Sequence, residues 1–574
     1  MSSFPEDRAG RFVPIVPVEE QEVVTMVDRP VLYRNGRLFT ADPEQPWASA
    51  LVVRGGRFAH VGTEAEARAH AGPEALEVDL EGSTVLPGFV DGHTHVLATG
   101  ETRMGVLLTD AADLHEIRRR VSGWAGEHPE AERVLGHGWL FGSVPDGNPT
   151  RWMLDEVVPD RPVYLEANDN HSVWVNSSAL AELGITGDTP DPTGGRIVRD
   201  PDTGEPTGHL EETALHNLVR PFLDGVTTDA DRDRALDTAV GEYLSAGVTG
   251  VVDMAVDEPA LAAMVRAERT NRLPLRIAGH WLVRRSDDPR EHFSQIERAA
   301  ELAETHRSDR LRVVGVKFLV DGVVDGCTAA MLEPYADGGN ADPIWDFEVL
   351  APAVAAADAA GLQVAVHAIG DAAVRTALDV FEHAARVNGA HRRRHRIEHL
   401  ECVAPEDVAR LAELGVTASM QPVHSDPAIR GNWAAMLGDV RAERGFAWPA
   451  MTDNGARLVF GTDAPTAPHP PLPNMFVAST RRSAMSPELP ALQPHLTVPV
   501  ARAIEHATAD AAWSCHADTE RGRLRSGFLA DFVVLDRNPC TAEDPEELLR
   551  TRVLRTVLDG RSVWRWPGRG QEEC

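Results

Sequence analysis

Seven times between residues 231 and 463, an amphipathic helical stretch leads into a short run that is almost continuously apolar. Such runs are typical of parallel strands that are buried on both faces. An eighth run, which begins at Val85, precedes them in the chain. Eight β/α units predict an α/β fold with a closed (β/α)8 barrel, the TIM-barrel architecture. The strands that we expect in the repeat are 247–253, 275–280, 312–320, 362–367, 394–399, 416–421 and 457–463.

The two ends of the chain show another pattern, in which short strand-like runs are separated by turns. Two-residue turns at Asn35-Gly36 and Gly55-Gly56 predict two hairpins in a small antiparallel sheet. Similar strand-like runs return after residue 530. We therefore expect the two ends of the chain to meet in one β-sandwich beside the barrel.

At 574 residues the chain is too long for a single ordinary core, so several structural units are expected. Residues 100–230 break the β/α rhythm and predict an insertion with its own small α/β fold, which topology places over the barrel mouth. The expected domains are a composite β-sandwich from 28–86 and 522–568, and a barrel domain over 87–521 that includes the insertion.

Composition narrows the expected partners and location. A net charge of −32 argues against nucleic acid or an anionic membrane as a partner, because either would be repelled. No apolar run reaches about eighteen residues, and the first residues do not have the pattern of a signal peptide. The five cysteines are scattered and include no C-x-x-C pair. We therefore expect no disulfide framework, and a reducing cytoplasm as the location.

Two histidines end the apolar run that begins at Val85. His93 and His95 are two residues apart, so in an extended segment both imidazoles point to the same side. This is the arrangement that two ligands of one metal ion require. The alternative is that His93 and His95 are simply polar residues at the end of a strand. The polar residues that follow other predicted strands make this alternative less favourable.

Polar residues lie in or after several other predicted strands. Because all strands of such a barrel present their carboxyl ends to one face, these side chains are expected to converge. Lys317 is also the only lysine of the chain, among 56 lysines and arginines. Arginine cannot replace lysine where a neutral amine must react. The candidate set is His93, His95, Lys317, His367, His399 and Asp463.

This pattern resembles the metal-dependent amidohydrolase superfamily and, within it, the amidohydrolase 3 branch that includes N-substituted formamide deformylase. The resemblance covers nearly the whole chain. The segments that carry it are Leu86–His95, Val316–Gly322, Val366–Asp371, Arg396–His399, Phe460–Asp463 and Ala530–Asp536, with Asp169–Asn176 and Pro206–Gly208 in the insertion.

The resemblance implies a divalent metal, usually zinc, held by His93, His95 and Asp463. It implies a second metal ion held by His367 and His399. Lys317 would bridge the two ions as a carbamate formed from carbon dioxide. A site with one metal, in which Lys317 only forms hydrogen bonds, is the alternative. A homodimer is a further expectation, because dimers are common among similar proteins.

The expected chemistry is hydrolysis by water that the metal activates. Asp463 can take the proton from this water and pass it to the leaving amine, acting as general acid and base. A neighbouring donor, His399 or His171, would stabilise the oxyanion. Lys317 and His399 are thus catalytic candidates as well as ligands.

Substrate-binding candidates are Trp139, His171 and Trp174 of the insertion and Gln421 at a strand end, with His424 as a weaker one. Trp139 and Trp174 could equally be the insertion's own core. The function that we favour is cleavage of a C–N amide bond in an N-substituted formamide or other N-acyl amine, with a small-molecule amide as substrate. The second hypothesis for the function is a deaminase or another hydrolase on the same barrel. The third hypothesis is a scaffold that binds no metal.

Overall fold

The computed structural model describes residues 29–567, except 169–171, 193–194, 390–392 and 543. At its centre lies an eight-stranded parallel sheet in the order β21-β20-β19-β18-β17-β16-β15-β8. The backbone N–H groups of Thr462 and Asp463 donate to the carbonyl of His93, which links the last strand to the first. The sheet is therefore a nearly closed barrel, and the predicted fold is confirmed. Its strands are β8 (Phe89–Thr94), β15 (Val248–Val256), β16 (Arg276–Leu282), β17 (Leu311–Leu319), β18 (Gln363–Ala368), β19 (Arg396–His399), β20 (Thr417–Met420) and β21 (Arg457–Phe460).

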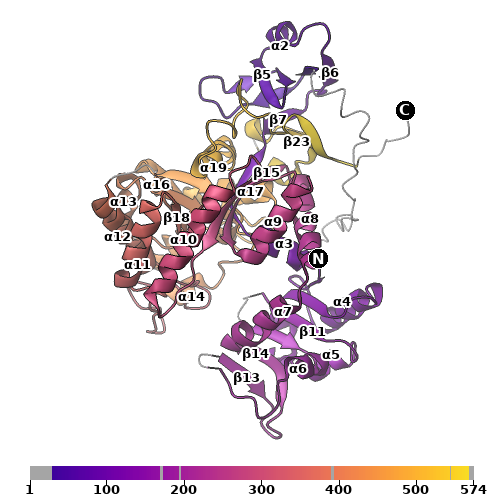
Figure 1. Ribbon diagram of the computed structural model, residues 1–574, viewed down its shortest axis with the longest axis vertical. Helices are drawn as coiled ribbons and strands as arrows, with labels where there is room; N and C mark the ends of the chain where they lie inside the picture. Colours follow the sequence, from indigo (N-terminus) through magenta and orange to yellow (C-terminus); the bar gives the residue numbers. More distant parts are fainter. Residues whose placement is uncertain (1–28, 169–171, 193–194, 390–392, 543, 568–574) are drawn as a thin grey trace.

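Helices surround this sheet and bury their apolar faces against it (Figure 1). The largest hydrophobic core lies between strands and helices, as the alternation of apolar runs and amphipathic stretches predicts. The helices are α3 (Val96–Arg103), α8 (Asp229–Ser245), α9 (Glu258–Arg269), α10 (Pro289–Thr305), α11 (Phe347–Ala359), α12 (Asp371–Asn388), α13 (Val408–Glu413), α16 (Trp448–Asp453), α17 (Pro471–Thr480), α18 (Val500–His506) and α19 (Ala509–Ser514). In the described part of the chain, no helix combines the length and apolarity that spanning a bilayer requires.

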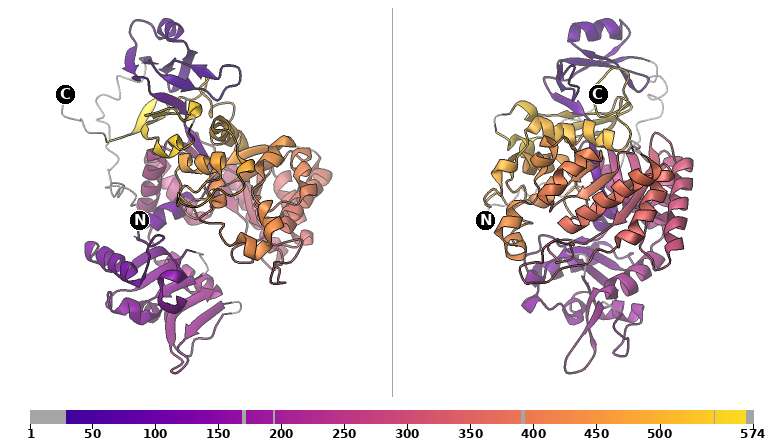
Figure 2. Two further views of the ribbon diagram at one scale, coloured as in Figure 1. Left: turned by 180° about the vertical axis from the view of Figure 1, so that it is seen from behind. Right: turned by 90° about the vertical axis from the view of Figure 1, so that its left-hand side faces the viewer.

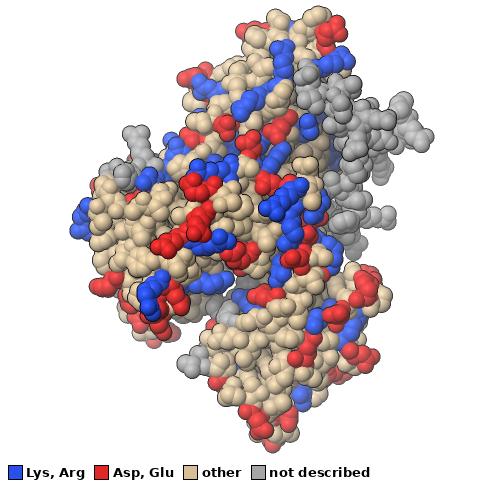
Figure 3. All heavy atoms as spheres, in the orientation of Figure 1, with Lys and Arg blue, Asp and Glu red and all other residues tan. Residues whose placement is uncertain are grey.

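Charged side chains of both signs are interspersed over the face in Figure 3. Oppositely charged side chains also pair between neighbouring helices. Arg266 of α9 lies 2.7 Å from Asp233 of α8, and Arg272 after α9 lies 2.6 Å from Asp237 of α8. These acidic residues of α8 are thus partly neutralised by local ion pairs.

The two ends of the chain share a six-stranded sheet in the order β24-β23-β22-β7-β2-β3. The C-terminal strand β22 pairs antiparallel with the N-terminal strand β7, so the predicted joining of the two ends is confirmed. A second, four-stranded sheet has the order β5-β4-β1-β6. The domain limits 28–86, 522–568 and 87–521 stay a prediction. The strands are β1 (Val31–Arg34), β2 (Arg37–Phe39), β3 (Trp47–Ala48), β4 (Ala50–Arg54), β5 (Arg57–Gly62), β6 (Leu76–Asp79), β7 (Thr84–Pro87), β22 (Phe532–Leu535), β23 (Val553–Leu558) and β24 (Arg561–Arg565).

One of the two predicted hairpins is wrong. The turn at Asn35-Gly36 forms, with Asn35 at φ +55°, but β1 and β2 on its two sides belong to different sheets. β1 pairs parallel with β6 and β2 pairs parallel with β7, so this region is not purely antiparallel. Turn residues specify a change of direction, whereas the strand partners come from later in the chain. The second hairpin, β4 with β5, is confirmed.

The apolar run that begins at Val85 is divided between two sheets rather than forming one barrel strand. Val85 and Leu86 lie in β7 of the composite sheet, and the barrel strand β8 begins at Phe89. Gly88 joins them, where an added Cβ would lie 2.3 Å from the hydroxyl oxygen of Thr249. The absence of a side chain at residue 88 therefore lets the segment pass directly from one sheet into the other.

The predicted insertion is a separate α/β unit with its own six-stranded sheet, in the order β13-β14-β12-β11-β10-β9. Figures 1 and 2 place it at the opposite end of the molecule from the four-stranded sheet. Its elements are β9 (Val106–Leu107), β10 (Val134–Trp139), β11 (Val163–Ala167), β12 (Ser172–Val175), β13 (Gly195–Arg199), β14 (Pro206–Glu212), α4 (Leu114–Glu127), α5 (Arg151–Asp155), α6 (Ser177–Leu183) and α7 (Arg220–Val226).

A buried ion pair connects the barrel to the composite sheet. Arg276, at the start of β16, is 1% exposed and donates to both carboxylate oxygens of Asp531, at 2.7 and 2.9 Å. The same guanidinium contacts Asp559 after β23. This bidentate geometry offsets the cost of burying the two charges.

Replacing Arg276 with methionine is expected to destabilise the protein by about 3–5 kcal/mol, because Asp531 would remain buried without its counter-charge. Thermal and chemical unfolding midpoints measure this. The matched control is Arg298→Met, which removes the exposed pair of Arg298 with Glu258 and should cost less than about 1 kcal/mol. Equal shifts in the two variants would contradict the special role of the buried pair.

Candidate metal centre

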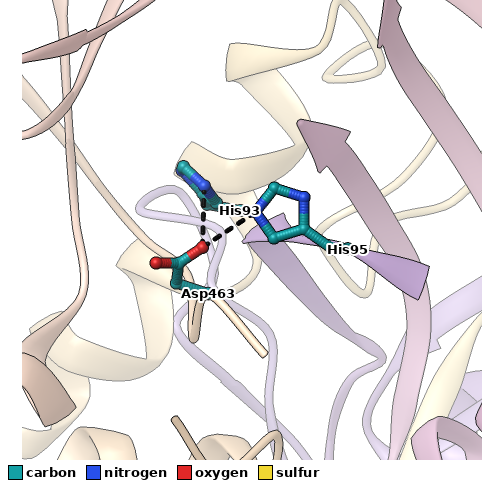
Figure 4. A group of neighbouring side chains, drawn as sticks. All are labelled: His93, His95 and Asp463. Atoms are coloured by element: carbon teal, nitrogen blue, oxygen red, sulfur yellow. Dashed lines mark hydrogen bonds and ion pairs between the residues drawn. The ribbon is translucent and has the colours of Figure 1, made fainter. Parts of the chain in front are cut away.

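Three predicted ligands meet at the carboxyl ends of β8 and β21. His93 lies in β8, His95 directly follows it, and Asp463 follows β21. The Nε2 atoms of His93 and His95 lie 3.1 and 3.0 Å from Oδ1 of Asp463 (Figure 4). One ligand atom from each residue lies within 4.8 Å of the other two. Two imidazole nitrogens and a carboxylate oxygen are a suitable ligand set for zinc.

The ring nitrogen of His93 that does not face Asp463 contacts a carboxylate, which was not among the residues predicted from the sequence. Nδ1 of His93 lies 2.7 Å from Oε2 of Glu398, a residue with no exposed surface. Arg396 donates to Glu398, and also to the carbonyl of Gly92 at 2.6 Å. Burial alone would raise the pKa of Glu398, but the charge of Arg396 and the contact with His93 hold it well below its usual value. An ionised Glu398 keeps the proton on Nδ1 of His93 and leaves Nε2 free as a ligand atom.

Replacing Glu398 with glutamine is therefore expected to weaken metal binding by about 10–100-fold, because the amide no longer fixes the His93 tautomer by charge. Titration with a competing chelator measures the affinity. Glu182→Gln is a matched control, since Glu182 also accepts from an arginine and a second side chain but lies in the insertion. An unchanged affinity in Glu398→Gln would show that His93 needs no such support.

Lys317 lies in β17 and is 1% exposed. Its Nζ has no hydrogen-bond partner among the described residues. Burial lowers the pKa of Lys317 to about 8, although the charges of Glu398 and Asp463 oppose this shift. A buried, unpaired amine is costly unless it gains a partner or a covalent modification. This environment suits an amine that reacts or that faces a ligand.

His367 in β18 and His399 at the end of β19 bring two further imidazoles to the same end of the barrel. The ring centroids of His367 and His399 are 4.4 Å apart, and those of His93 and His399 are 4.9 Å apart. Burial lowers the pKa of His367 to about 3 and that of His399 well below its usual value. Both rings are thus neutral, as metal ligands must be. Nδ1 of His399 is buried and has no partner in the described part of the chain.

A second set of ligand atoms lies on the other side of Asp463. It consists of His399, His424 and Asp463, again with one atom from each within 4.8 Å of the others. His424 follows β20 and contacts Glu401. Glu401, like Glu398, was not among the residues predicted from the sequence. The signal was present in the sequence, since Glu398 and Glu401 lie on either side of His399 at the end of a predicted strand. The donor set therefore suits one or more divalent ions.

The predicted substrate-binding residues have different positions. Trp139 and Trp174 have no exposed surface and lie in the insertion's own core, where their indole N–H groups donate to the carbonyls of Leu165 and Thr150. This arrangement agrees with the structural alternative, and a substrate contact by either ring stays a prediction. His171 lies outside the described residues.

Gln421 lies directly after β20, at the carboxyl end of the barrel. It is 1% exposed, and neither its amide oxygen nor its amide nitrogen has a partner among the described residues. A buried primary amide with free donor and acceptor can recognise a polar group of a ligand. Its substrate-binding role stays a prediction.

A nearly closed (β/α)8 barrel with histidines, a carboxylate and a buried lysine at its carboxyl ends is typical of metal-dependent hydrolases. The model of the amidohydrolase family matches residues 76–564. This protein belongs to the amidohydrolase family. The family supports a general hydrolase role with a divalent metal.

Similarity to individual proteins covers most of the chain. It is 32% identical to Protein LONG AFTER FAR-RED 3 of Arabidopsis thaliana, over 93% of this chain and 91% of that protein. It is 29% identical to N-substituted formamide deformylase of Arthrobacter pascens, over 93% and 98%. The crystal structure of an uncharacterized metal-dependent hydrolase from Pyrococcus furiosus is similar with a TM-score of 0.73 and 28% identity, covering 89% of this chain and all of that one. These similarities agree on the fold and leave the substrate to be proposed.

Proposed function

We propose that this protein hydrolyses a C–N amide bond in an N-substituted formamide or another N-acyl amine. The observation that carries the proposal is the meeting of His93 and His95 on one oxygen of Asp463, in the barrel that also buries Lys317. The similarity to a formamide deformylase supports the substrate class.

We further propose that the metal is zinc, in two ions, with His93, His95 and Asp463 holding one and His367 and His399 contributing to the other. A bound divalent ion would supply Lewis-acid chemistry, lowering the pKa of a coordinated water and polarising the substrate carbonyl. The buried amine of Lys317 and the unpartnered Nδ1 of His399 fit such a centre, because each lacks a partner among the described residues.

Lys317 is proposed to carry a carbamate, whose oxygens would help to hold the two ions. Its neutral amine attacks carbon dioxide: an N–C bond forms, one C=O π bond breaks with its electron pair moving to oxygen, and the nitrogen loses one proton to solvent. The pKa of about 8 supports this step, because an appreciable fraction of the amine is neutral near that pH. The product is an anion in place of an unpaired buried cation.

Asp463 is proposed to carry the proton between water and leaving group. Burial would raise its pKa, but the adjacent imidazoles of His93 and His95 hold that pKa well below its usual value. The carboxylate is thus ready to accept the proton that water loses as the new C–O bond forms. The proton then passes to the nitrogen as the C–N bond breaks, which gives a carboxylic acid and an amine. His399, which has a ligand atom within 4.8 Å of one of Asp463, is proposed to help stabilise the oxyanion.

Amine release from a panel of N-substituted formamides, N-acyl amino acids and cyclic amides tests the proposal. We expect hydrolysis of at least one formamide or N-acyl amine, loss of it after chelation, and recovery with zinc. Ammonia release from aromatic amines instead would favour a deaminase. Less than about one metal equivalent per chain under mild purification would favour the scaffold hypothesis.

A further inference from the structure

The two oxygens of Asp463 contact different side chains. Oδ1 lies beside His93 and His95, at 3.1 and 3.0 Å. Oδ2 accepts from the hydroxyl of Thr466 at 3.0 Å and lies 3.6 Å from Nε2 of His424. Asp463 is 6% exposed, so neither oxygen is extensively hydrated. The carboxylate therefore lies between the first-strand histidines and a histidine that follows β20.

His424 is supported in the same way as His93. Nδ1 of His93 contacts Glu398 at 2.7 Å, and Nδ1 of His424 contacts Glu401 at 3.1 Å. Both carboxylates are buried, at 0% and 7% exposure. A carboxylate that accepts from one ring nitrogen, leaving the other free, is typical of histidines that bind metal. Each pair directs Nε2 toward one oxygen of Asp463.

His399 lies close to both His424 and His367. The rings of His399 and His424 are nearly parallel, at 7°, with centroids 5.9 Å apart. The ligand atoms of His399, His424 and Asp463 lie within 4.8 Å of one another. His367, in contrast, uses its Nε2 to donate to the carbonyl of Gly322 at 3.1 Å. The geometry alone thus gathers three ligands without His367.

From this arrangement we infer that His424 is a ligand of the second metal ion, which it shares with His399 and Oδ2 of Asp463. Glu401 fixes the orientation and tautomer of His424. Asp463 thereby contacts both ions, one through each oxygen. The inference rests on the proposed metal-dependent function and deepens it. It adds His424 to His367 and His399 as a proposed ligand of the second ion.

Metal binding to the full-length protein tests this inference without reference to turnover. Metal-free protein is titrated with Zn²⁺ against a chelator, and with Co²⁺ monitored by its visible absorption. We expect two equivalents in the unsubstituted protein. His424→Ala should weaken the binding of one equivalent by more than about 100-fold, while the other keeps its affinity. Loss of a residue that only supports a ligand costs about 10–100-fold, so a larger effect indicates a direct ligand. Glu401→Gln should weaken the same equivalent by about 10-fold.

The control is His506→Ala, which breaks a similar pair, since Nδ1 of His506 contacts Asp510 at 2.9 Å in the segment of α18 and α19. It should leave both affinities unchanged. His424→Gln and a thermal unfolding curve guard against misfolding of the alanine variant. Unchanged binding of two equivalents in both His424 variants would overturn the inference, as would a single equivalent in the unsubstituted protein. Two-site binding without any amide hydrolysis would instead contradict only the proposed function.

Discussion

Replacing Asp463 with asparagine is expected to reduce kcat/KM for the amide substrate by about 1,000-fold or more. Asparagine keeps the size of the side chain but loses the charge and the ability to carry a proton. Its NH2 group would also point a donor at nitrogens that must be free to bind metal. Steady-state kinetics and metal analysis on the same preparation measure the two losses separately.

Asp358→Asn is a control for this substitution, because Asp358 is also buried and paired with a histidine, His395, but lies on α11 outside the centre. It should retain activity and metal. If Asp463→Asn keeps its metal and more than about a tenth of the activity, a smaller loss than general acid–base catalysis supplies, Asp463 is not the proton carrier.

Replacing Lys317 with alanine is expected to abolish most activity and to lower the metal content. Lys317→Arg should be equally inactive, because a guanidinium stays charged and cannot add carbon dioxide. The variants therefore distinguish a lysine that reacts from one that only supplies positive charge. An active Lys317→Arg enzyme would contradict the carbamate.

The single lysine of the chain permits a direct test of the modification. Protein equilibrated with 13C-labelled bicarbonate should show a carbamate carbon resonance that is absent from Lys317→Ala. In metal-free protein the signal should decline as the pH falls below about 8, because protonation of the amine removes the nucleophile. A signal that persists in Lys317→Ala arises from the N-terminal amine and would not support a bridging lysine.

The architecture of the barrel could be predicted because a strand that is buried on both faces is recognisable in the sequence as a run of apolar residues. Most of the strands from β15 to β21 are short and largely apolar, and the polar residue at the end of such a strand is conspicuous against its neighbours. The same logic located His93, His95 and Lys317. Strand partners left no such trace, so the hairpin of β1 with β2 was predicted wrongly, and the division between β7 and β8 was missed.

The amino-acid sequence by itself determined the eight β/α units, the joining of the two chain ends and the residues that converge at one end of the barrel, because side-chain periodicity records which faces are buried. Only the tertiary structure decided how these residues are paired. Glu398 and His93 are 305 residues apart in the chain, yet they share a hydrogen bond in the barrel. The contact of His424 with Glu401 and the burial of Trp139 inside the insertion likewise depend on how neighbouring elements pack, which local sequence patterns do not encode.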